Sequence, residues 1–194
     1  KVIIMEPFKV SPHLSTLLDS YPDVQLIIDA AKNGGNPSKE AIARLWLSEG
    51  IPFAFKKSPA LYEVVRVWLG TRLNVDPKEI HLSGSARIGQ SLAPAKLGTV
   101  FGSHSDLDLF VVSESLFDNV TADFNNWSYD FETGSVQPNN DTEGKYWVEN
   151  NTRGQKNLQR GFLDSFIVPN RDAYPTIKKI SQSMWLLKQK LDVT

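Results

Sequence analysis

The sequence contains no cysteine. Disulfide bonds and thiolate metal sites are therefore excluded, and the absence fits a cytoplasmic protein, which is the localisation we expect. No apolar run approaches the roughly 18 residues of a membrane-spanning helix, so we expect no membrane association. Zinc-ligand spacings, a P-loop and the glycine pattern of a dinucleotide-binding fold are missing as well.

The chain is long enough for one well-packed domain. Its 194 residues suit a single domain, or one core with a helical extension, and a hydrophobic content of 41% is sufficient for a packed interior. We expect a helical N-terminal extension over residues 1–75 that packs on a core formed by residues 76–194. Because the sequence shows no internal repeat and no low-complexity tract, one compact unit is the expected organisation.

The small net charge of −1 conceals an uneven distribution. Residues 101–143 carry nine acidic side chains and no lysine or arginine, whereas residues 145–194 carry nine basic and four acidic ones. An acidic zone followed by a basic one suits the binding of a metal–polyphosphate complex, and solvated surfaces with clustered charge are the alternative explanation.

Apolar spacing predicts helices in the first part of the chain and both helices and strands after it. The polar stretch at residues 132–160 has no clean period, so we expect a loop or an irregular hairpin there. The expected helices cover residues 22–32, 38–50 (capped by Ser38), 59–73, 85–92 and 174–191, and the expected strands cover residues 80–82, 107–112 and 162–168. These elements predict an α/β fold, with helices on one face of a small mixed sheet.

Two short stretches carry the chemistry that the sequence suggests. Gly84-Ser85 stands where a strand ends and a helix begins, and Gly84 lets a phosphate approach the backbone because it has no Cβ. The stretch 105–112, of which 107–112 is the clearest part, reads as a strand with Asp106 and Asp108 two residues apart, which predicts that both carboxylates point to one face. Carboxylates held this close repel each other unless a cation lies between them, as when a protein presents Mg²⁺ to a triphosphate.

This arrangement resembles the DNA polymerase β-like nucleotidyltransferase superfamily over residues 80–168. In that family the Gly-Ser holds the terminal phosphates of a nucleoside triphosphate, and two aspartates and a third carboxylate on a neighbouring strand form a two-metal Mg²⁺ site. The resemblance implies the small mixed sheet of the nucleotidyltransferase fold. It implies phosphate binding by Gly84 and Ser85, and catalytic metal binding by Asp106, Asp108 and Asp164.

Further residues are candidates for the same site. Arg87 and the pair Lys178 and Lys179 are expected to contact the triphosphate, since a basic residue after the third strand often does so in this family. Between Ser85 and Asp106 lie 20 residues, a longer interval than is usual in the family, and we expect a loop or small hairpin there. The alternatives for the third carboxylate are Asp130, Glu132 and Glu143.

The resemblance implies a Mg²⁺-dependent enzyme that transfers NMP from an NTP, ATP by default, to a hydroxyl acceptor. The acceptor stays open among a second nucleotide, an RNA 3′ end, a protein hydroxyl and a small molecule. Residues 83–89 are similar to the signalling and antiviral-defence branches of the superfamily, although the Gly-Thr usual in the signalling enzymes is missing. The near-neutral net charge argues against a long nucleic-acid track.

Two rival functions follow from the same residues. One is a catalytically silent module of this fold that senses a nucleotide or pairs with a toxin. The other is a protein-interaction domain that binds no ligand. A protein partner, or a further C-terminal domain beyond residue 194, is the element we expect to close the site if this chain alone is incomplete.

Overall fold

The computed structural model describes residues 10–191, which form two compact units. Unit 1 comprises residues 10–65 and 80–111, and unit 2 comprises residues 66–79 and 112–191. The chain therefore passes between the units after Val65, Glu79 and Val111, whereas we expected one boundary near residue 75.

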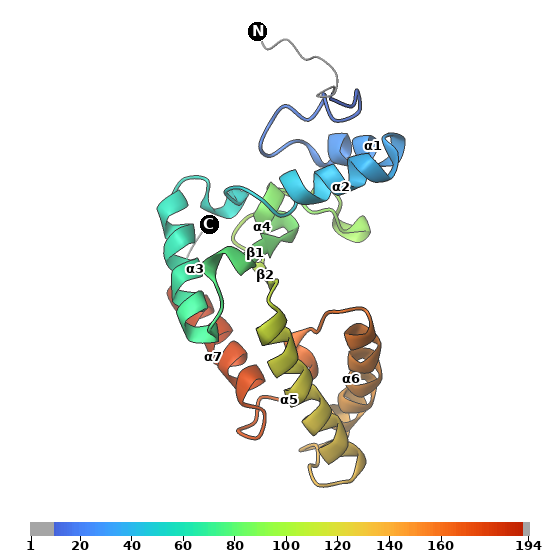
Figure 1. The fold of residues 1–194 in the computed structure, drawn as a ribbon, viewed down its shortest axis with the longest axis vertical. Coiled ribbons are helices and arrows are strands. Elements are labelled where there is room, and N and C mark those ends of the chain that lie inside the picture. The colour runs from blue at the N-terminus through green and yellow to red at the C-terminus, as the bar shows by residue number, and fades with distance from the viewer. Residues whose placement is uncertain (1–9, 192–194) are drawn as a thin grey trace. The chain divides into compact units, whose positions relative to one another are not determined.

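Residues 10–191 have a mixed α/β fold with seven α-helices and one pair of antiparallel strands (Figure 1). The expected α/β class is therefore confirmed, and the nucleotidyltransferase fold itself stays a prediction. In this part of the chain the sheet is antiparallel rather than mixed, because the strand expected at 162–168 does not form. None of the helices described is both long and apolar enough to cross a membrane.

In unit 1, the helices α1 (Val24–Asn33) and α2 (Gly35–Leu45) lie side by side (Figure 1). Apolar side chains at helical spacing close a small core between them, as expected for α1. The start expected for α2 at Ser38 is wrong, because the positive φ of 65° at Gly35 makes the break by itself and Ser38 is buried inside the helix. The buried members of this core are Leu17, Ile27, Ala30, Ile42 and Ile88.

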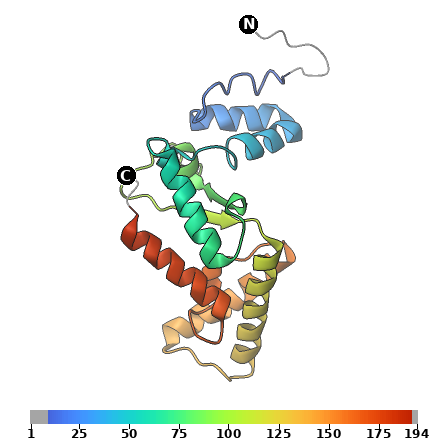
Figure 2. The same ribbon diagram turned by 60° about the vertical axis from the view of Figure 1, so that its left-hand side comes forward.

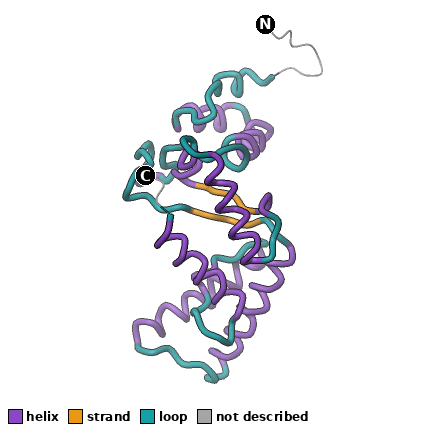
Figure 3. The backbone as a smooth tube through the Cα atoms, turned by 90° about the vertical axis from the view of Figure 1, so that its left-hand side faces the viewer, coloured by secondary structure: helices purple, strands orange, loops and turns teal. Residues whose placement is uncertain are grey.

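The sheet of unit 1 consists of β1 (Ile80–Ser83) and β2 (Asp108–Val111), drawn in orange in Figure 3. The helix α4 (Gly84–Ile88) follows β1 directly and is shorter than expected, because Gly89 takes a left-handed conformation with φ of 88°. Between α4 and β2, a bridge between Gln90 and Val100 confirms the expected small hairpin.

Unit 2 is built on three long helices, α5 (Glu114–Glu132), α6 (Asp141–Gln159) and α7 (Pro175–Lys190). Both α6 and α7 pack against α5 (Figure 2). Aromatic rings fill the space between α5 and α6: Trp127 stacks on Phe131 with 6.0 Å between ring centroids, and Trp147 meets both rings edge-on. The helix α7 confirms the expectation for residues 174–191, and no element had been predicted for most of α5.

The loop or hairpin expected at residues 132–160 is wrong, since most of this stretch is α6. The helix is polar on most sides, which hides its period, and only Trp147 and Gly154 are buried. Its start is fixed by the Asn140 side chain, which accepts a hydrogen bond from the Glu143 backbone N–H at 2.9 Å.

The strand expected at 162–168 is also wrong, because the 3₁₀ helix η4 (Ser165–Ile167) takes its place. The Asp164 side chain accepts a hydrogen bond from the Phe166 backbone N–H at 3.0 Å, and this local turn competes with an extended strand. The other 3₁₀ helices are η1 (Phe53–Phe55), η2 (Pro77–Glu79) and η3 (Pro94–Lys96), and α3 (Pro59–Leu73) confirms the third expected helix.

Candidate functional site

The pairing of β1 with β2 brings the Gly-Ser turn to the aspartate pair. The register places Ser83 opposite Asp108, so the turn that follows β1 lies beside the residue that begins β2 (Figure 3). The Ser83 hydroxyl donates a hydrogen bond of 3.4 Å to the backbone oxygen of Asp108. Two motifs that are far apart in the sequence therefore form one surface in unit 1.

Gly84 is the closest point of contact in this surface. Its φ of 63° lies in the left-handed region, where a side chain is strained. A Cβ built on Gly84 would lie 2.6 Å from Oδ2 of Asp108, which is too close for a real contact. Position 84 therefore favours glycine for its backbone conformation, and a Cβ there would make the Asp108 carboxylate shift.

The side chains of Asp106 and Asp108 are exposed, and no basic side chain among the described residues forms an ion pair with either one. Only Asp108 belongs to β2, so the expectation that both carboxylates lie on one strand is wrong, because Asp106 precedes its start. Within residues 10–191 no ion pair or side-chain hydrogen bond engages either carboxylate. Partial burial, and then the neighbouring charge of Asp106, raise the pKa of Asp108 above its usual value.

This donor set fits Mg²⁺. Mg²⁺ is commonly held by one or two carboxylates together with substrate phosphates rather than by a full cage of protein ligands. Two uncompensated aspartates, one of which ionises less readily than usual, are a set that a divalent cation would stabilise. In the described part of the chain, no group of three or more His, Asp or Glu side chains is gathered as a metal site.

Arg87 points away from the exposed surface of the turn. Only 3% of Arg87 is exposed, and its Nη2 donates to the Leu45 carbonyl at 3.5 Å. The Nε and Nη1 atoms have no hydrogen-bond partner within the residues described, and burial lowers the pKa of the guanidinium. The predicted contact of Arg87 with a triphosphate would require its side chain to leave this buried position.

The sequence reasoning missed two aromatic side chains on the face that carries Asp108. His81 pairs with Phe110 across the sheet, and alternation places them on the same face as Ser83 and Asp108. Their rings are stacked with 5.1 Å between centroids, and the His81 Nδ1 lies 3.3 Å from the Ser48 carbonyl oxygen. The spacing of two residues between Asp108 and Phe110 was the signal that could have identified this face.

The remaining predicted site residues belong to unit 2. Asp164 caps η4 and lies 4.0 Å from Arg153, and Lys178 forms an ion pair with the exposed Asp172. Lys179 is exposed on the first turns of α7 and offers its backbone carbonyl to the Ser183 hydroxyl at 2.7 Å. The structure thus places Asp164, Lys178 and Lys179 in a different compact unit from Gly84, Ser85, Arg87, Asp106 and Asp108.

The alternatives for the third carboxylate all have structural partners in unit 2. Asp130 accepts a hydrogen bond of 3.1 Å from the Tyr174 hydroxyl, and burial and this bond raise the pKa of Tyr174 to about 12. Glu132 accepts from the Asn151 side chain at 2.9 Å, and Glu143 lies in the first turn of α6 beside its cap. Each of these carboxylates therefore contributes to holding unit 2 together.

Comparison with protein-family models, with curated proteins and with solved structures gave no significant match.

Proposed function

We propose that this protein is a Mg²⁺-dependent nucleotidyltransferase that transfers NMP from an NTP, ATP by default, to a hydroxyl acceptor. The observation that carries the proposal is the position of the Asp108 carboxylate beside the Gly-Ser turn, where a Cβ built on Gly84 would lie 2.6 Å from Oδ2 of Asp108. A phosphate-accessible turn beside uncompensated carboxylates is the combination that binding of a metal–triphosphate complex requires.

In this proposal, some residues of unit 1 would bind the phosphates and others would bind Mg²⁺. Gly84 carries no Cβ beside the Asp108 carboxylate, and the half-buried Ser85 would offer a hydroxyl donor to phosphate oxygens. Asp106 and Asp108 would hold Mg²⁺, and Asp164, Lys178 and Lys179 stay predicted members of the site. When bound, Mg²⁺ would neutralise phosphate charge and assist attack of the acceptor hydroxyl on the α-phosphorus, with pyrophosphate as the leaving group.

The acceptor remains one of four proposed classes, which are a second nucleotide, an RNA 3′ end, a protein hydroxyl and a small molecule. The similarity of residues 83–89 to signalling and defence-associated enzymes supports a role in signalling-nucleotide synthesis or antiviral defence. A cytoplasmic location is part of the same proposal.

A second candidate function is nucleotide binding without turnover. One observation favours it: Asp164, the predicted third carboxylate, is engaged locally as the cap of η4 instead of standing on a strand. A protein that keeps the aspartate pair but lacks a third metal ligand would bind a metal–nucleotide complex and leave it unchanged.

Thermal unfolding of the full chain with each NTP, with and without Mg²⁺, tests the binding site. We expect a Mg²⁺-dependent rise in Tm with at least one NTP, since a ligand that binds only the folded state stabilises it according to its concentration relative to Kd. Asp108→Asn should abolish the rise. Asp118→Asn is the matched control, because Asp118 is exposed on α5 and the substitution removes the same charge. No rise with any NTP would overturn both candidate functions.

Release of pyrophosphate then separates the two candidates. The wild-type chain is incubated with Mg²⁺, the NTP that raises its Tm and acceptors of each proposed class. Pyrophosphate release that depends on one acceptor supports transfer and identifies that acceptor class. A Mg²⁺-dependent rise in Tm without pyrophosphate release supports the sensing module instead.

A further inference from the structure

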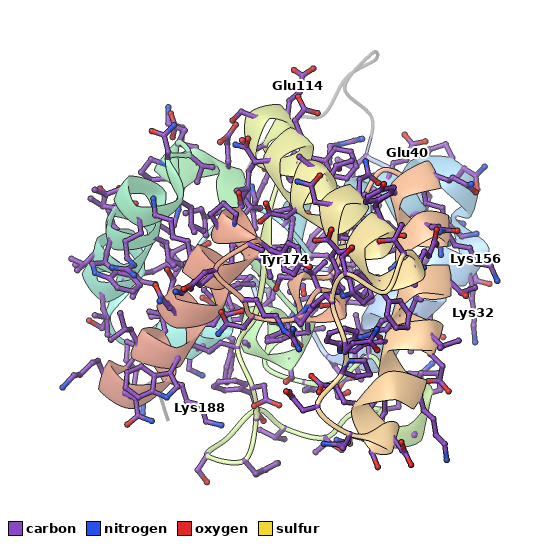
Figure 4. All side chains as sticks on the ribbon, turned by 90° about the horizontal axis from the view of Figure 1, so that it is seen from below. Lys32, Glu40, Glu114, Lys156, Tyr174 and Lys188 are labelled. Carbon is purple, nitrogen blue, oxygen red and sulfur yellow. The ribbon has the colours of Figure 1, made fainter. Side chains whose placement is uncertain are left out.

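One face of α6 carries a row of positive charge. At the helical spacing of about 100° per residue, four lysine and arginine side chains fall within an arc of about 80°. This arc lies opposite to the face that buries Trp147 and Gly154. The row extends about 22 Å along the helix axis. Its cations are Lys145, Arg153 and Lys156 on α6 and Arg160 at the C-cap of the helix, all exposed, with Glu149 as the one acidic side chain among them (Figure 4 labels Lys156).

Two exposed phenylalanines follow the end of α6 in the chain. Phe162, which is 44% exposed, lies between α6 and η4, and Phe166, which is 72% exposed, lies within η4. The guanidinium of Arg160 lies 5.1 Å from the centre of the Phe162 ring, and Arg153 lies 4.0 Å from Asp164 in the same segment. These contacts attach the aromatic segment to the cationic row.

The outward position of Phe166 is imposed by its neighbours. Ile167 and Val168 take the buried positions, at 1% and 3% exposure. The Asn150 side chain donates to the Ile167 carbonyl at 3.1 Å, and the Asp164 cap fixes the turn on the other side of Phe166. The fold therefore holds the Phe166 ring in solvent, where a partner can reach it.

We propose that this basic aromatic face, formed by Lys145, Arg153, Lys156, Arg160, Phe162 and Phe166, binds a single-stranded nucleic acid. The cationic row complements a phosphate backbone, and the exposed rings offer flat partners on which unpaired bases can stack. The carboxylates of an acidic protein segment would satisfy the charges but would not stack on the Phe166 ring. The proposal concerns unit 2 and does not depend on nucleotidyl transfer.

The local charge explains how such binding is compatible with the near-neutral chain. The net charge of −1 is a sum over the whole sequence, in which the acidic stretch of residues 101–143 offsets the basic residues of α6. A short cationic row supports binding of a few nucleotides, whereas a long track would need an extended basic surface. The expectation against a long nucleic-acid track is therefore compatible with this proposal.

Fluorescence anisotropy of labelled single strands with the full chain tests the proposal. The probes are oligo(U) RNA and oligo(dT) DNA of about 12 nucleotides, within the usual range of single-strand sites. We expect binding at about 50 mM salt that weakens steeply towards about 200 mM, because phosphate contacts release counterions. Comparison of the two probes shows whether the 2′-hydroxyl contributes. Absence of binding at the lower salt, or binding insensitive to salt, would overturn the proposal.

Three variants locate the binding surface. Lys145→Gln/Lys156→Gln should weaken binding and reduce the salt slope by about 0.7 for each phosphate that is no longer neutralised, whereas Lys188→Gln/Lys190→Gln on α7 removes the same charge and should leave binding unchanged. Phe166→Ala should weaken binding about fivefold or more without altering the salt slope. Equal weakening by both lysine pairs would overturn the assignment to this face.

Competition and a site variant distinguish the alternatives. An excess of an acidic peptide should displace the strands poorly, and equal displacement at equal charge would assign the face to an acidic protein instead. Asp108→Asn should leave strand binding intact, so failure of the proposed nucleotide site and failure of this proposal give different results. Circular dichroism melting of each variant confirms that its fold is retained.

Discussion

Unit 1 and unit 2 both hold aspartates beside the end of a secondary-structure element, and their surroundings differ. In unit 2, the buried Asp123 accepts a hydrogen bond of 2.9 Å from the Ile177 backbone N–H at the start of α7, and Asp130 accepts one from Tyr174 (Figure 4 labels Tyr174). In unit 1, Asp106 and Asp108 are exposed, and no hydrogen-bond donor or cation among the described residues engages either side chain.

The difference separates structural carboxylates from those available to a ligand. A buried carboxylate with a satisfied hydrogen bond stabilises its helix terminus, and its removal leaves an unpaired donor. An exposed pair with no internal partner contributes little to stability and lies open to an external cation. Sequence spacing alone does not distinguish these roles, since both kinds of aspartate occur among apolar residues in the acidic stretch 101–143.

The largest effect is expected from Asp123→Ala. The substitution leaves the Ile177 N–H buried without a partner and removes a negative charge from the start of α7, so we expect a loss of about 2–3 kcal/mol in the free energy of unfolding. Urea unfolding followed by tryptophan fluorescence measures this loss. Asp118→Ala, at an exposed position of the same helix, should change stability by less than about 0.5 kcal/mol. Similar losses in both variants would contradict a specific capping role.

Gly84→Ala should cost about 1–2 kcal/mol of stability, because alanine is strained at a positive φ. Gly161→Ala is the matched control, since Gly161 has a φ of 80° but nothing within 4 Å of its position for Cβ. The two variants should lose similar stability in urea unfolding. Only Gly84→Ala should also lose the Mg²⁺–NTP rise in Tm, because its Cβ displaces the Asp108 carboxylate. Retention of that rise in Gly84→Ala would separate the turn from the proposed site.

Tyr174→Phe should cost about 1 kcal/mol at neutral pH, the usual worth of one hydrogen bond. Because the folded pKa of Tyr174 is raised to about 12 from the ordinary 10.0, the wild-type chain should lose stability as the pH rises through this interval. Tyr174→Phe should remove that part of the alkaline loss, measured by urea unfolding at several pH values. Tyr129→Phe, at a tyrosine that is 68% exposed, should retain it.

The smallest effect, and the one of opposite sign, is expected from Asp108→Asn without metal. The pKa of Asp108 is higher in the folded chain than in the unfolded chain. The chain therefore loses some stability as the pH rises from below the unfolded pKa through the folded pKa, and at neutral pH the ionised Asp108 carboxylate opposes folding. Asp108→Asn should therefore raise Tm slightly at pH 7 and have no such effect below the unfolded pKa. A lowered Tm at pH 7 would show that Asp108 has a stabilising partner.

Local sequence signals predicted several elements of both units. The helices expected at 59–73 and 174–191 correspond to α3 and α7, because apolar spacing along one helix depends only on neighbouring residues. The predictions for residues 132–160 and 162–168 were wrong for different reasons. The strand predicted at 162–168 does not form because the Asp164 side chain caps a local 3₁₀ turn. Most of α6 is polar, and its buried Gly154 lies where a Cβ would meet the Phe124 ring at 2.1 Å, so its position depends on contact with α5.

The chemistry of the candidate site was determined by the sequence, because a glycine without Cβ and two carboxylates keep these properties in any fold. The tertiary structure decided that Gly84 and the Asp108 carboxylate lie side by side. The register that pairs Ser83 with Asp108 brings Gly84 against the carboxylate across the 20 residues that separate Ser85 from Asp106. Burial decided the position of Arg87 in the same way, since its partner, the Leu45 carbonyl, comes from a distant segment and local spacing does not encode that contact.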